Sequence, residues 1–315
     1  MRLTVMVGLP GSGKSTIAQQ NYPEAVYISS DAIREEMFGD ANEQKNPSEV
    51  FREMLIRTHE ALNDGMDVVY DATNLEWRKR RALVTEVKKM HYGIVCECVI
   101  VLCSITECKR RQLSRDRKVP DHVIDRMARQ FHVPYYNEGW DSIILCENGP
   151  MQDIDKEHTR LRETMHDNPH HSTGNIGAHC TAAYAAMQEL IGDLPEEDPQ
   201  VALFKKIMLE AAYQHDIGKR KTKVFHDAKG KPTDEAHYYG HENIGAYLWL
   251  TGDKRNEWDG YAFLVIAVLI QLHMKPYSFP NRSEAELTTW CKRAGFSEEF
   301  AQWIWLLHRA DEGAH

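Results

Sequence analysis

The first half of the chain alternates short apolar runs with longer segments whose hydrophobic positions recur at helical spacing. The apolar runs have the length and composition of buried strands, and they span residues 3–9, 25–29, 67–72, 96–103 and 142–146. Strands that alternate with helices predict a parallel sheet with helices on both faces. We therefore expect an α/β domain over residues 1–148.

Beyond Gly149 the strand pattern ends. Helical periodicity replaces it, and long helices are predicted at residues 181–194, 201–214 and 261–274, with helix also over 210–220. The turn-forming residues at 147–153 indicate a domain boundary, and residues 227–235 indicate a loop within the helical part. We expect the second domain, residues 149–315, to be all-α.

Length and composition fit a soluble protein of two domains. The chain has 315 residues, of which 27% are charged and 42% hydrophobic. The N-terminal apolar run leads into a glycine loop, so we expect a strand there and not an export signal, and no apolar run approaches the roughly 20 residues of a membrane helix. Seven cysteines, an odd number without a CxxC pair, favour reduced thiols and a cytoplasmic location.

The net charge of −9 argues against broad electrostatic capture of nucleic acid. Basic residues do cluster at 78–81 and 109–118. By charge alone such runs are expected to be solvated faces of helices. We therefore expect the protein to bind any nucleic acid only locally, through a few nucleotides at a short single-stranded end.

The segment GLPGSGKST satisfies the phosphate-binding pattern GxxxxGK[ST] and stands between a predicted strand and a predicted helix. Backbone N–H groups of such a loop surround the β-phosphate of a nucleotide. Lys14 would reach the β- and γ-phosphates, and Ser15 would hold Mg²⁺. The expected ATP-binding residues are Gly8, Pro10, Gly11, Ser12, Gly13, Lys14, Ser15 and Thr16.

Polar residues that follow the next strands are candidates for binding and activating the molecule that accepts the phosphoryl group. Asp31 and Arg34 share a helix face one turn apart, where a carboxylate could accept the proton of an attacking hydroxyl and an arginine could hold an acceptor phosphate. The same spacing is also commonplace at helix starts. Asp71 ends a further strand, and Arg111 with Arg115 could close over ATP and neutralise the transferred phosphoryl group.

These features resemble the kinase domain of phage-type 5′-polynucleotide kinases over roughly residues 3–140. The resemblance implies that Asp31 is the general base and that Arg34 binds the phosphate next to the acceptor 5′-OH. It makes Asp71 an essential supporting residue and Arg115 the lid arginine that faces the transferred phosphate. Arg110, Arg111 and Arg117 remain alternatives for the lid position.

The second half holds histidines and aspartates in apolar helical contexts, widely separated in sequence. A single buried histidine is usually structural, but the set is large: His179, His215, Asp216, His241, His273 and Asp311. Imidazole and carboxylate suit Mn, Fe, Ni, Co or Zn. Two adjacent metals need a bridging carboxylate, for which Asp216 is the natural candidate.

The order H…HD…H…H…D resembles the HD phosphohydrolase superfamily. The resemblance implies that His179, His215, Asp216 and Asp311 bind one metal, that His241 and His273 extend the site to a second, and that Lys219 faces the phosphate. Residues 171–181 resemble a segment of the HD domain in bacterial CCA-adding enzymes, which implies hydrolysis of 2′,3′-cyclic and 2′- or 3′-phosphates on RNA ends, with His171 near metal or phosphate.

The two resemblances together predict a bifunctional RNA end-healing enzyme. It would use ATP, Mg²⁺ and one or two transition metals to phosphorylate 5′-OH ends and remove terminal phosphates. A separate RNA ligase would act downstream, because the chain has no KxDG-like ligase motif. The sequence leaves open whether DNA ends are also substrates and whether the protein forms a homo-oligomer. The rival interpretations are a metabolite or nucleoside kinase fused to an HD nucleotidase, and an HD nucleotide sensor that regulates a P-loop ATPase.

Overall fold

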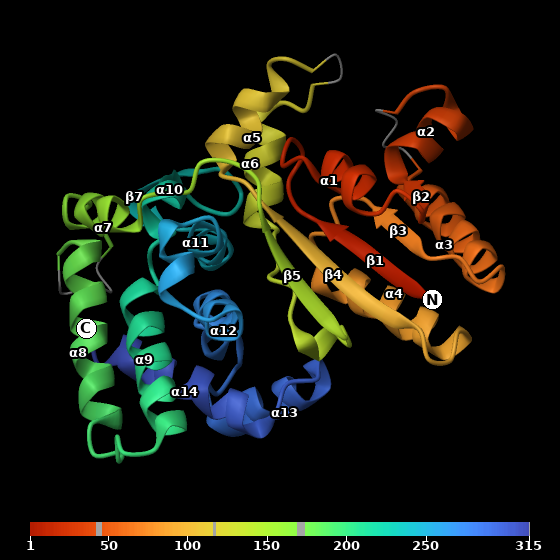
Figure 1. The fold of residues 1–315 in the computed structure, drawn as a ribbon. Helices are drawn as coiled ribbons and strands as arrows, with labels where there is room; N and C mark the ends of the chain where they lie inside the picture. The colour runs from red at the N-terminus through yellow and green to blue at the C-terminus, as the bar shows by residue number, and fades with distance from the viewer. Residues whose placement is uncertain (42–45, 116–117, 169–173, 315) are drawn as a thin grey trace. The chain divides into compact units, whose positions relative to one another are not determined.

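A computed structural model describes residues 1–41, 46–115, 118–168 and 174–314, and it divides into two compact units (Figure 1). The N-terminal unit comprises Met1–Ala128 and Pro134–Pro150, and the C-terminal unit comprises Arg129–Val133 and Met151–His315. The predicted boundary between residues 148 and 149 lies close to the later of these transitions. The short segment 129–133 was not expected in the C-terminal unit.

The N-terminal unit contains a five-stranded parallel sheet in the order β2-β3-β1-β4-β5. Its strands are β1 Arg2–Val7, β2 Val26–Ser29, β3 Val68–Asp71, β4 Val95–Leu102 and β5 Ser142–Glu147. β1 and β4 are buried over all but their first residue, which explains their nearly continuous apolar sequence, since helices cover both faces of a parallel sheet. The predicted parallel sheet is confirmed.

Helices connect these strands, and they are α1 Lys14–Asn21, α2 Ser30–Phe38, α3 Pro47–Asn63, α4 Trp77–Met90, α5 Ile105–Gln112 and α6 Asp121–Arg129. A short 3₁₀ turn, Tyr136–Glu138, precedes β5. In the sheet register Asp71 lies beside Met6 on one side and Ser29 on the other. The loops that follow β1, β2 and β3 therefore meet at the carboxyl edge of the sheet, where open α/β folds bind ligands.

The basic run at residues 78–81 is not wholly a solvated helix face. Arg80 is buried, and its guanidinium donates two hydrogen bonds to the carboxylate of Glu138, at 2.7 and 2.5 Å. A third bond from the same group reaches the carbonyl of Asn74 at 2.7 Å. Charge patterning could not show this pairing because Glu138 is 58 residues away. Arg80 thereby stabilises the loop that follows β3.

The C-terminal unit is mainly helical. Its helices are α7 Ile154–Arg162, α8 Ile176–Ile191, α9 Pro199–Gln214, α10 Lys219–Thr222, α11 His241–Leu250, α12 Gly260–Leu272, α13 Glu284–Ala294 and α14 Glu298–Glu312, with the 3₁₀ turns Asp253–Glu257 and Pro276–Ser278. The helix predicted over 210–220 stops at Gln214, and a turn precedes α10. Gly218 lies in that turn, where an added Cβ would stand 2.0 Å from the carbonyl oxygen of His241.

The expectation of an all-α second domain was wrong in one place. Strands β6 Val224–His226 and β7 Pro232–His237 pair as an antiparallel hairpin. The side chain of Asp227 accepts hydrogen bonds from the backbone N–H groups of Lys229 and Lys231, at 2.8 and 2.9 Å. Such local bonds favour a tight turn, whereas β7 carries little of the apolar alternation from which a strand is recognised in sequence.

Helix α12 forms the centre of the C-terminal unit, since its residues 262–271 are all buried. By length and composition the stretch Gly260–Ser278 could cross a membrane, contrary to the expectation that no apolar run comes close to that length. However, 61% of its apolar window is buried inside the unit. This burial is what a core helix requires.

Residues 129–133 are anchored to the helices of the C-terminal unit. Gln271 accepts a hydrogen bond from the backbone of Val133 at 2.9 Å and donates to the carbonyl of Phe131 at 2.8 Å. The ring of Phe131 is fully buried and meets Tyr247 edge-on at 4.9 Å. This segment therefore contributes to the core of a unit that otherwise begins at residue 151.

We expect the change Phe131→Ala to lower the free energy of unfolding of the C-terminal unit by about 3–5 kcal/mol, because it leaves a cavity in a closed core. Urea unfolding of the whole chain, followed by tryptophan fluorescence, measures this. Tyr92→Ala is the control, since Tyr92 is fully exposed. Equal unfolding midpoints for the two variants would contradict this role of the segment.

Candidate functional site

The phosphate-binding loop lies between β1 and α1 with its glycines in the left-handed region, at φ +85° for Gly11 and +95° for Gly13. A Cβ at Gly13 would stand 2.1 Å from the amide nitrogen of Asn148, so the close approach also requires glycine. Lys14 is buried and donates from Nζ to the carbonyl of Leu9 at 3.0 Å. Burial lowers the pKa of this ammonium group, while Asp71 and Asp31 oppose the shift.

Asp71 links the loop to β3. The hydroxyl of Ser15 donates to its Oδ2 at 2.6 Å, and the hydroxyl of Tyr27 donates to the same oxygen. Burial, followed by this hydrogen bond, raises the pKa of Tyr27 to about 12. The predicted magnesium ligand Ser15 thus lies against a buried carboxylate, a pair of oxygen ligands that suits Mg²⁺.

Asp31 and Arg34 lie on the first turns of α2 at the same sheet edge. Arg34 donates from Nη1 to Oδ1 of Asp31 at 3.0 Å and to the carbonyl of Ser30 at 3.3 Å. The side chain of Asp31 is 51% exposed, whereas that of Arg34 is 9% exposed. The carboxylate is therefore accessible to an incoming hydroxyl, and the arginine beside it is held in place by the helix.

The predicted lid arginines differ in their surroundings. Arg111 donates to the carbonyls of Ser12 and Asn148, at 3.2 and 2.9 Å, and to the carboxylate of Glu107. It therefore supports the backbone of the phosphate-binding loop and is not free to close over ATP. Arg115 is exposed, and after burial its positive charge is among the causes that lower the pKa of Lys14.

Two further arginines were considered for the lid position. Arg110 is exposed and pairs with the nearly buried Glu107, and Arg117 lies outside the described residues. Sequence reasoning missed Asn148, whose amide donates to the carbonyl of Ser12 at 2.6 Å. It follows β5, and only the strand order brings it to the loop. The assignment of Arg115 as the lid arginine stays a prediction.

Residues 3–134 match the protein family described as AAA domain. A curated relative, L-seryl-tRNA(Sec) kinase of Methanococcus maripaludis, is 27% identical over 147 residues, which are 44% of this chain and 56% of that protein. The chain thus spans about half the length of this relative. The N-terminal unit has the P-loop kinase fold. This fold implies ATP and Mg²⁺ as cofactors.

Two solved structures are also similar to the chain. A chain of the Pnkp1/Rnl/Hen1 RNA repair complex has a TM-score of 0.36 and 23% identity, over 41% of this chain and 43% of that one. A fungal RNA kinase has a TM-score of 0.36 and 14% identity, over 51% of this chain and 43% of that one.

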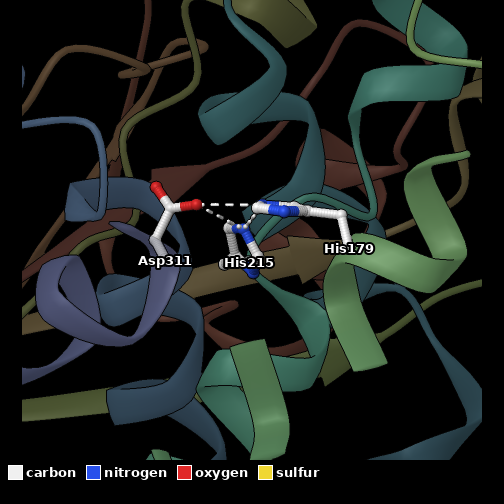
Figure 2. Close-up of side chains that lie close together, drawn as sticks. All are labelled: His179, His215 and Asp311. Atoms are coloured by element: carbon white, nitrogen blue, oxygen red, sulfur yellow. Dashed lines mark hydrogen bonds and ion pairs between the residues drawn. The ribbon is translucent and has the colours of Figure 1, made fainter. Parts of the chain in front are cut away.

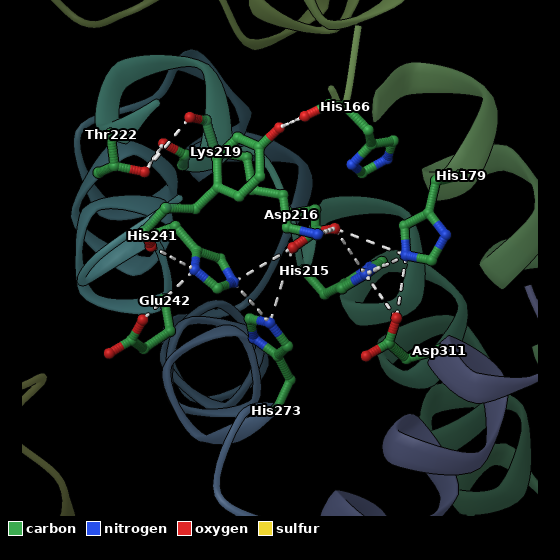
Figure 3. A network of polar contacts seen from close by, with 12 residues as sticks. His166, His179, His215, Asp216, Lys219, Thr222, His241, Glu242, His273 and Asp311 are labelled. Atoms are coloured by element: carbon green, nitrogen blue, oxygen red, sulfur yellow. Dashed lines mark hydrogen bonds and ion pairs between the residues drawn. The ribbon is translucent and has the colours of Figure 1, made fainter. Parts of the chain in front are cut away.

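The C-terminal unit gathers the predicted histidines and aspartates into one buried cluster (Figure 3). It consists of two groups, each small enough to surround one ion: His179, His215 and Asp311, and Asp216, His241 and His273. Figure 2 shows the first group, in which His179 Nε2 lies 2.9 Å from Asp311 Oδ1. These six residues come from α8, α11 and α14 and from the residues that directly follow α9 and α12.

Asp216 lies between the two groups and turns one oxygen toward each (Figure 3). Its Oδ2 is 3.3 Å from His215 Nε2 and 3.5 Å from His179 Nε2. Its Oδ1 is 3.3 Å from His241 Nε2 and 3.7 Å from His273 Nε2. This is the geometry of a carboxylate that can bridge two cations.

Three of the histidine rings form hydrogen bonds through Nδ1, the nitrogen that faces away from the cluster. These bonds determine which nitrogen can bind a cation. His215, His241 and His273 each place Nδ1 within 2.6–2.8 Å of the carbonyl of the residue three positions earlier. A carbonyl only accepts, so we assign the proton to Nδ1, and the lone pair of each Nε2 then faces the cluster. Metal-binding histidines are typically fixed in this way.

The inward lone pairs require a positive charge between them. His241 Nε2 lies 3.1 Å from His273 Nε2, and His215 Nε2 lies 3.2 Å from His179 Nε2, with carboxylate oxygens alongside. Two acceptors this close repel one another in a buried site unless a proton or a metal cation lies between them. The nitrogen and oxygen donor set fits Mn, Fe, Co, Ni or Zn.

Burial and the neighbouring charges shift the pKa values of these side chains in opposite directions. Burial opposes the charged form of His215, but Asp216 and Asp311 raise its pKa to about 10. Burial, with the nearby His241 and His215, lowers the pKa of His273 to about 3. Burial alone would raise the pKa of Asp216, but Lys219 and His215 hold it well below its usual range. The carboxylate at the centre is therefore ionised.

Several side chains around the cluster were missed in the sequence. Tyr277 donates to Oδ2 of Asp311 at 3.0 Å. The ring of His166 meets that of His179 edge-on at 5.5 Å, and the hydroxyl of Tyr238 donates to the carbonyl of His166. None of these belongs to a recognisable spacing. His171, predicted near metal or phosphate, lies outside the described residues.

Lys219, which is predicted to face the phosphate, lies beside the cluster. Its Nζ is 2.6 Å from Oδ2 of Asp216, and it also lies 5.4 Å from the centre of the Tyr238 ring. One turn of α10 thus presents a buried ammonium group to the bridging carboxylate. A phosphate bound between two metals would find the same cation within reach.

Proposed function

We propose that the chain is a bifunctional RNA end-healing enzyme. In this proposal the N-terminal unit phosphorylates 5′-OH ends with ATP, and the C-terminal unit is an HD-type phosphohydrolase that removes 2′,3′-cyclic or 2′- or 3′-phosphates. The observation that carries it is the double cluster centred on Asp216 in a chain whose other unit has the P-loop kinase fold. The resulting ends, 5′-phosphate and 3′-OH, are those that a separate ligase would join.

In the C-terminal site, two bound metals would supply Lewis-acid polarisation of a phosphate oxygen and a water of lowered pKa. His179, His215 and Asp311 would hold one metal, and His241 and His273 the other, with Asp216 between them. Lys219 would donate a hydrogen bond to the phosphate and so oppose its negative charge. Because the cluster is buried, these interactions act in a medium of low dielectric constant.

In the N-terminal site, the acceptor hydroxyl would approach the exposed carboxylate of Asp31, which would take its proton as a general base. Arg34 would hold the neighbouring phosphate of the polynucleotide. Lys14 would neutralise the β- and γ-phosphates, and Arg115 would face the transferred group. Ser15 and Asp71 would hold Mg²⁺.

Mass spectrometry of one short RNA tests both activities at once. The RNA carries a 5′-OH and a 2′,3′-cyclic phosphate and is incubated with the protein, ATP, Mg²⁺ and Mn²⁺. We expect gain of a 5′-phosphate that requires ATP, and loss of the terminal phosphate that does not. An RNA of unchanged mass would exclude polynucleotide ends as substrates.

The alternative acceptor is a small metabolite or nucleoside, with the C-terminal unit as a nucleotidase. We keep this alternative because the name of the curated relative, L-seryl-tRNA(Sec) kinase, does not describe a 5′-OH kinase. The two acceptors make different demands on Arg34. A polynucleotide presents a phosphate next to the reacting hydroxyl, whereas a nucleoside does not.

We therefore expect Arg34→Ala to reduce kcat/KM for an acceptor with a 3′-phosphate by about 10- to 100-fold, because a charged hydrogen bond worth about 1.5–3 kcal/mol is lost. The rate with the matching acceptor that lacks this phosphate should change little. Radiolabelled ATP and the two acceptors measure both rates. Equal losses on both would assign Arg34 to positioning Asp31, its partner at 3.0 Å.

A further inference from the structure

The hairpin of the C-terminal unit and the helix before it form a strongly basic stretch of an acidic chain. Residues 219–231 contain six cationic side chains and a single aspartate, in a protein with a net charge of −9. Lys219 is buried against Asp216, but Lys229 and Lys231, which flank the turn of the hairpin, are exposed. Arg220 and Lys221 pair with Glu157, and Lys223 pairs with Asp167. The positive charge that a ligand would meet is therefore that of Lys229 and Lys231.

Three aromatic rings stack at the base of this hairpin. The ring of Tyr239 lies parallel to that of His237, at 5.4 Å between centres and 6° between planes. His226 approaches the same tyrosine at 6.3 Å and 24°, and its carbonyl accepts a hydrogen bond from the tyrosine hydroxyl at 3.4 Å. Tyr239 is 40% exposed. We refer to His226, His237 and Tyr239 as the ring stack.

The ring stack is joined directly to the metal cluster. Tyr239 stands two residues before His241, whose Nδ1 bonds to the carbonyl of Tyr238 at 2.8 Å. Tyr238 in turn lies against Lys219, and its hydroxyl donates to the carbonyl of His166. Any group that binds to the ring stack is therefore held at a defined place relative to the cluster.

We propose that the ring stack and the hairpin lysines bind the single-stranded 3′ end of a polynucleotide whose terminal phosphate enters the metal cluster. A base would stack on Tyr239, and Lys229 and Lys231 would contact backbone phosphates. This inference rests on the proposed function of the C-terminal site and explains how an acidic chain could hold RNA. Stacking on aromatic rings beside a positive surface is how single strands are held without regard to sequence.

The residues of this surface fit a nucleic acid better than an acidic peptide or an apolar protein surface. An acidic peptide would match the lysines but would leave the flat faces of the rings without a partner. An apolar protein surface would pair poorly with the exposed Lys229 and Lys231. A nucleotide supplies both a π-face and an anion at a regular spacing.

The test compares Tyr239→Ala with Phe225→Ala in the full chain. Phe225 is 48% exposed, and its ring lies 5.6 Å from Nζ of Lys223 and is not a member of the ring stack. The substrates are a short single-stranded RNA with a 2′,3′-cyclic phosphate and bis(p-nitrophenyl) phosphate, which has no base. Tyr239→Trp, which keeps the stacking surface, is the conservative variant.

We expect Tyr239→Ala to raise KM for the RNA by about 5- to 100-fold, since stacking of one base is worth about 1–3 kcal/mol. Its kcat on RNA and its rate on bis(p-nitrophenyl) phosphate should equal those of the wild type, as should all constants of Phe225→Ala. Tyr239→Trp should restore KM. The double change Lys229→Ala and Lys231→Ala should make the plot of log binding constant against log salt concentration less steep. The expected change in slope is that for the loss of up to about two phosphate contacts.

An unchanged KM for Tyr239→Ala, with a wild type that removes the RNA phosphate, would overturn this inference and leave the proposed function intact. A parallel loss on both substrates would also overturn it, because the tyrosine would then act by positioning His241. If the wild type hydrolyses bis(p-nitrophenyl) phosphate but no RNA end, the proposed function itself fails. These three results are distinguishable within one set of assays.

Discussion

Replacing Asp216 by asparagine is expected to reduce removal of RNA end phosphates by a factor on the order of 10³ or more, which corresponds to about 4 kcal/mol of transition-state stabilisation. Asp216 offers one oxygen to each half of the cluster, so its loss affects both metal positions together. Asparagine keeps the size of the side chain but removes the negative charge that would offset the repulsion between two cations. Phosphate release from a 2′,3′-cyclic RNA end measures the effect.

Metal content gives a second measurement that does not depend on activity. We expect about two transition-metal ions per wild-type chain after loading and dialysis, and no more than one in Asp216→Asn, by elemental analysis. His158→Gln is the matched control, since His158 is a buried histidine of the same unit that bonds to Gln214 at 2.8 Å and is not in either group. Full metal content with lost activity would restrict Asp216 to a role in catalysis.

The parts of the fold that could be predicted are those with a local cause. β1 and β4 are recognisable because burial on both faces demands an unbroken apolar run. The phosphate-binding loop is recognisable because its glycines must adopt positive φ close to a neighbouring backbone. The β6–β7 hairpin escaped prediction because it depends on the side chain of Asp227 and not on apolar alternation.

Pairings across the chain account for most of what could not be predicted. Arg80 meets Glu138, and Asn148 meets Ser12, only because the order of strands brings their loops together. Each of these residues looks like an ordinary surface residue in the sequence. The same reason explains Arg111, whose spacing suggested a lid but whose contacts are with the carbonyls of the loop itself.

For the histidine–aspartate cluster, the sequence indicated the residues but not how they are arranged. His179 and Asp311 lie 132 residues apart and still come within 2.9 Å. Spacing in sequence cannot establish such a contact, so the expectation rested on family resemblance. The orientation of Nδ1 toward a carbonyl three residues earlier depends on where α9 and α12 end. That detail is what leaves the Nε2 lone pairs facing one another.

The second large effect is expected from Lys14, at the other site. Lys14→Met should reduce 5′-phosphorylation by a factor on the order of 10²–10³, because a preorganised cation facing the γ-phosphate is lost. Methionine fills a similar volume, so the buried position near Leu9 stays occupied. Transfer of label from ATP to a 5′-OH RNA measures the rate, and removal of terminal phosphate by the same variant should equal that of the wild type.

Lys88→Met is the control for the loss of a lysine, because Lys88 pairs with Asp141 on the surface of the same unit at 2.8 Å. It should phosphorylate RNA at the wild-type rate. If Lys14→Met also loses removal of terminal phosphate, the two sites are coupled and the reactions cannot be assigned to separate units. If Asp216→Asn affects only phosphate removal and Lys14→Met only phosphorylation, each broken end has its own site, which explains why one chain carries both a phosphate-binding loop and a histidine–aspartate cluster.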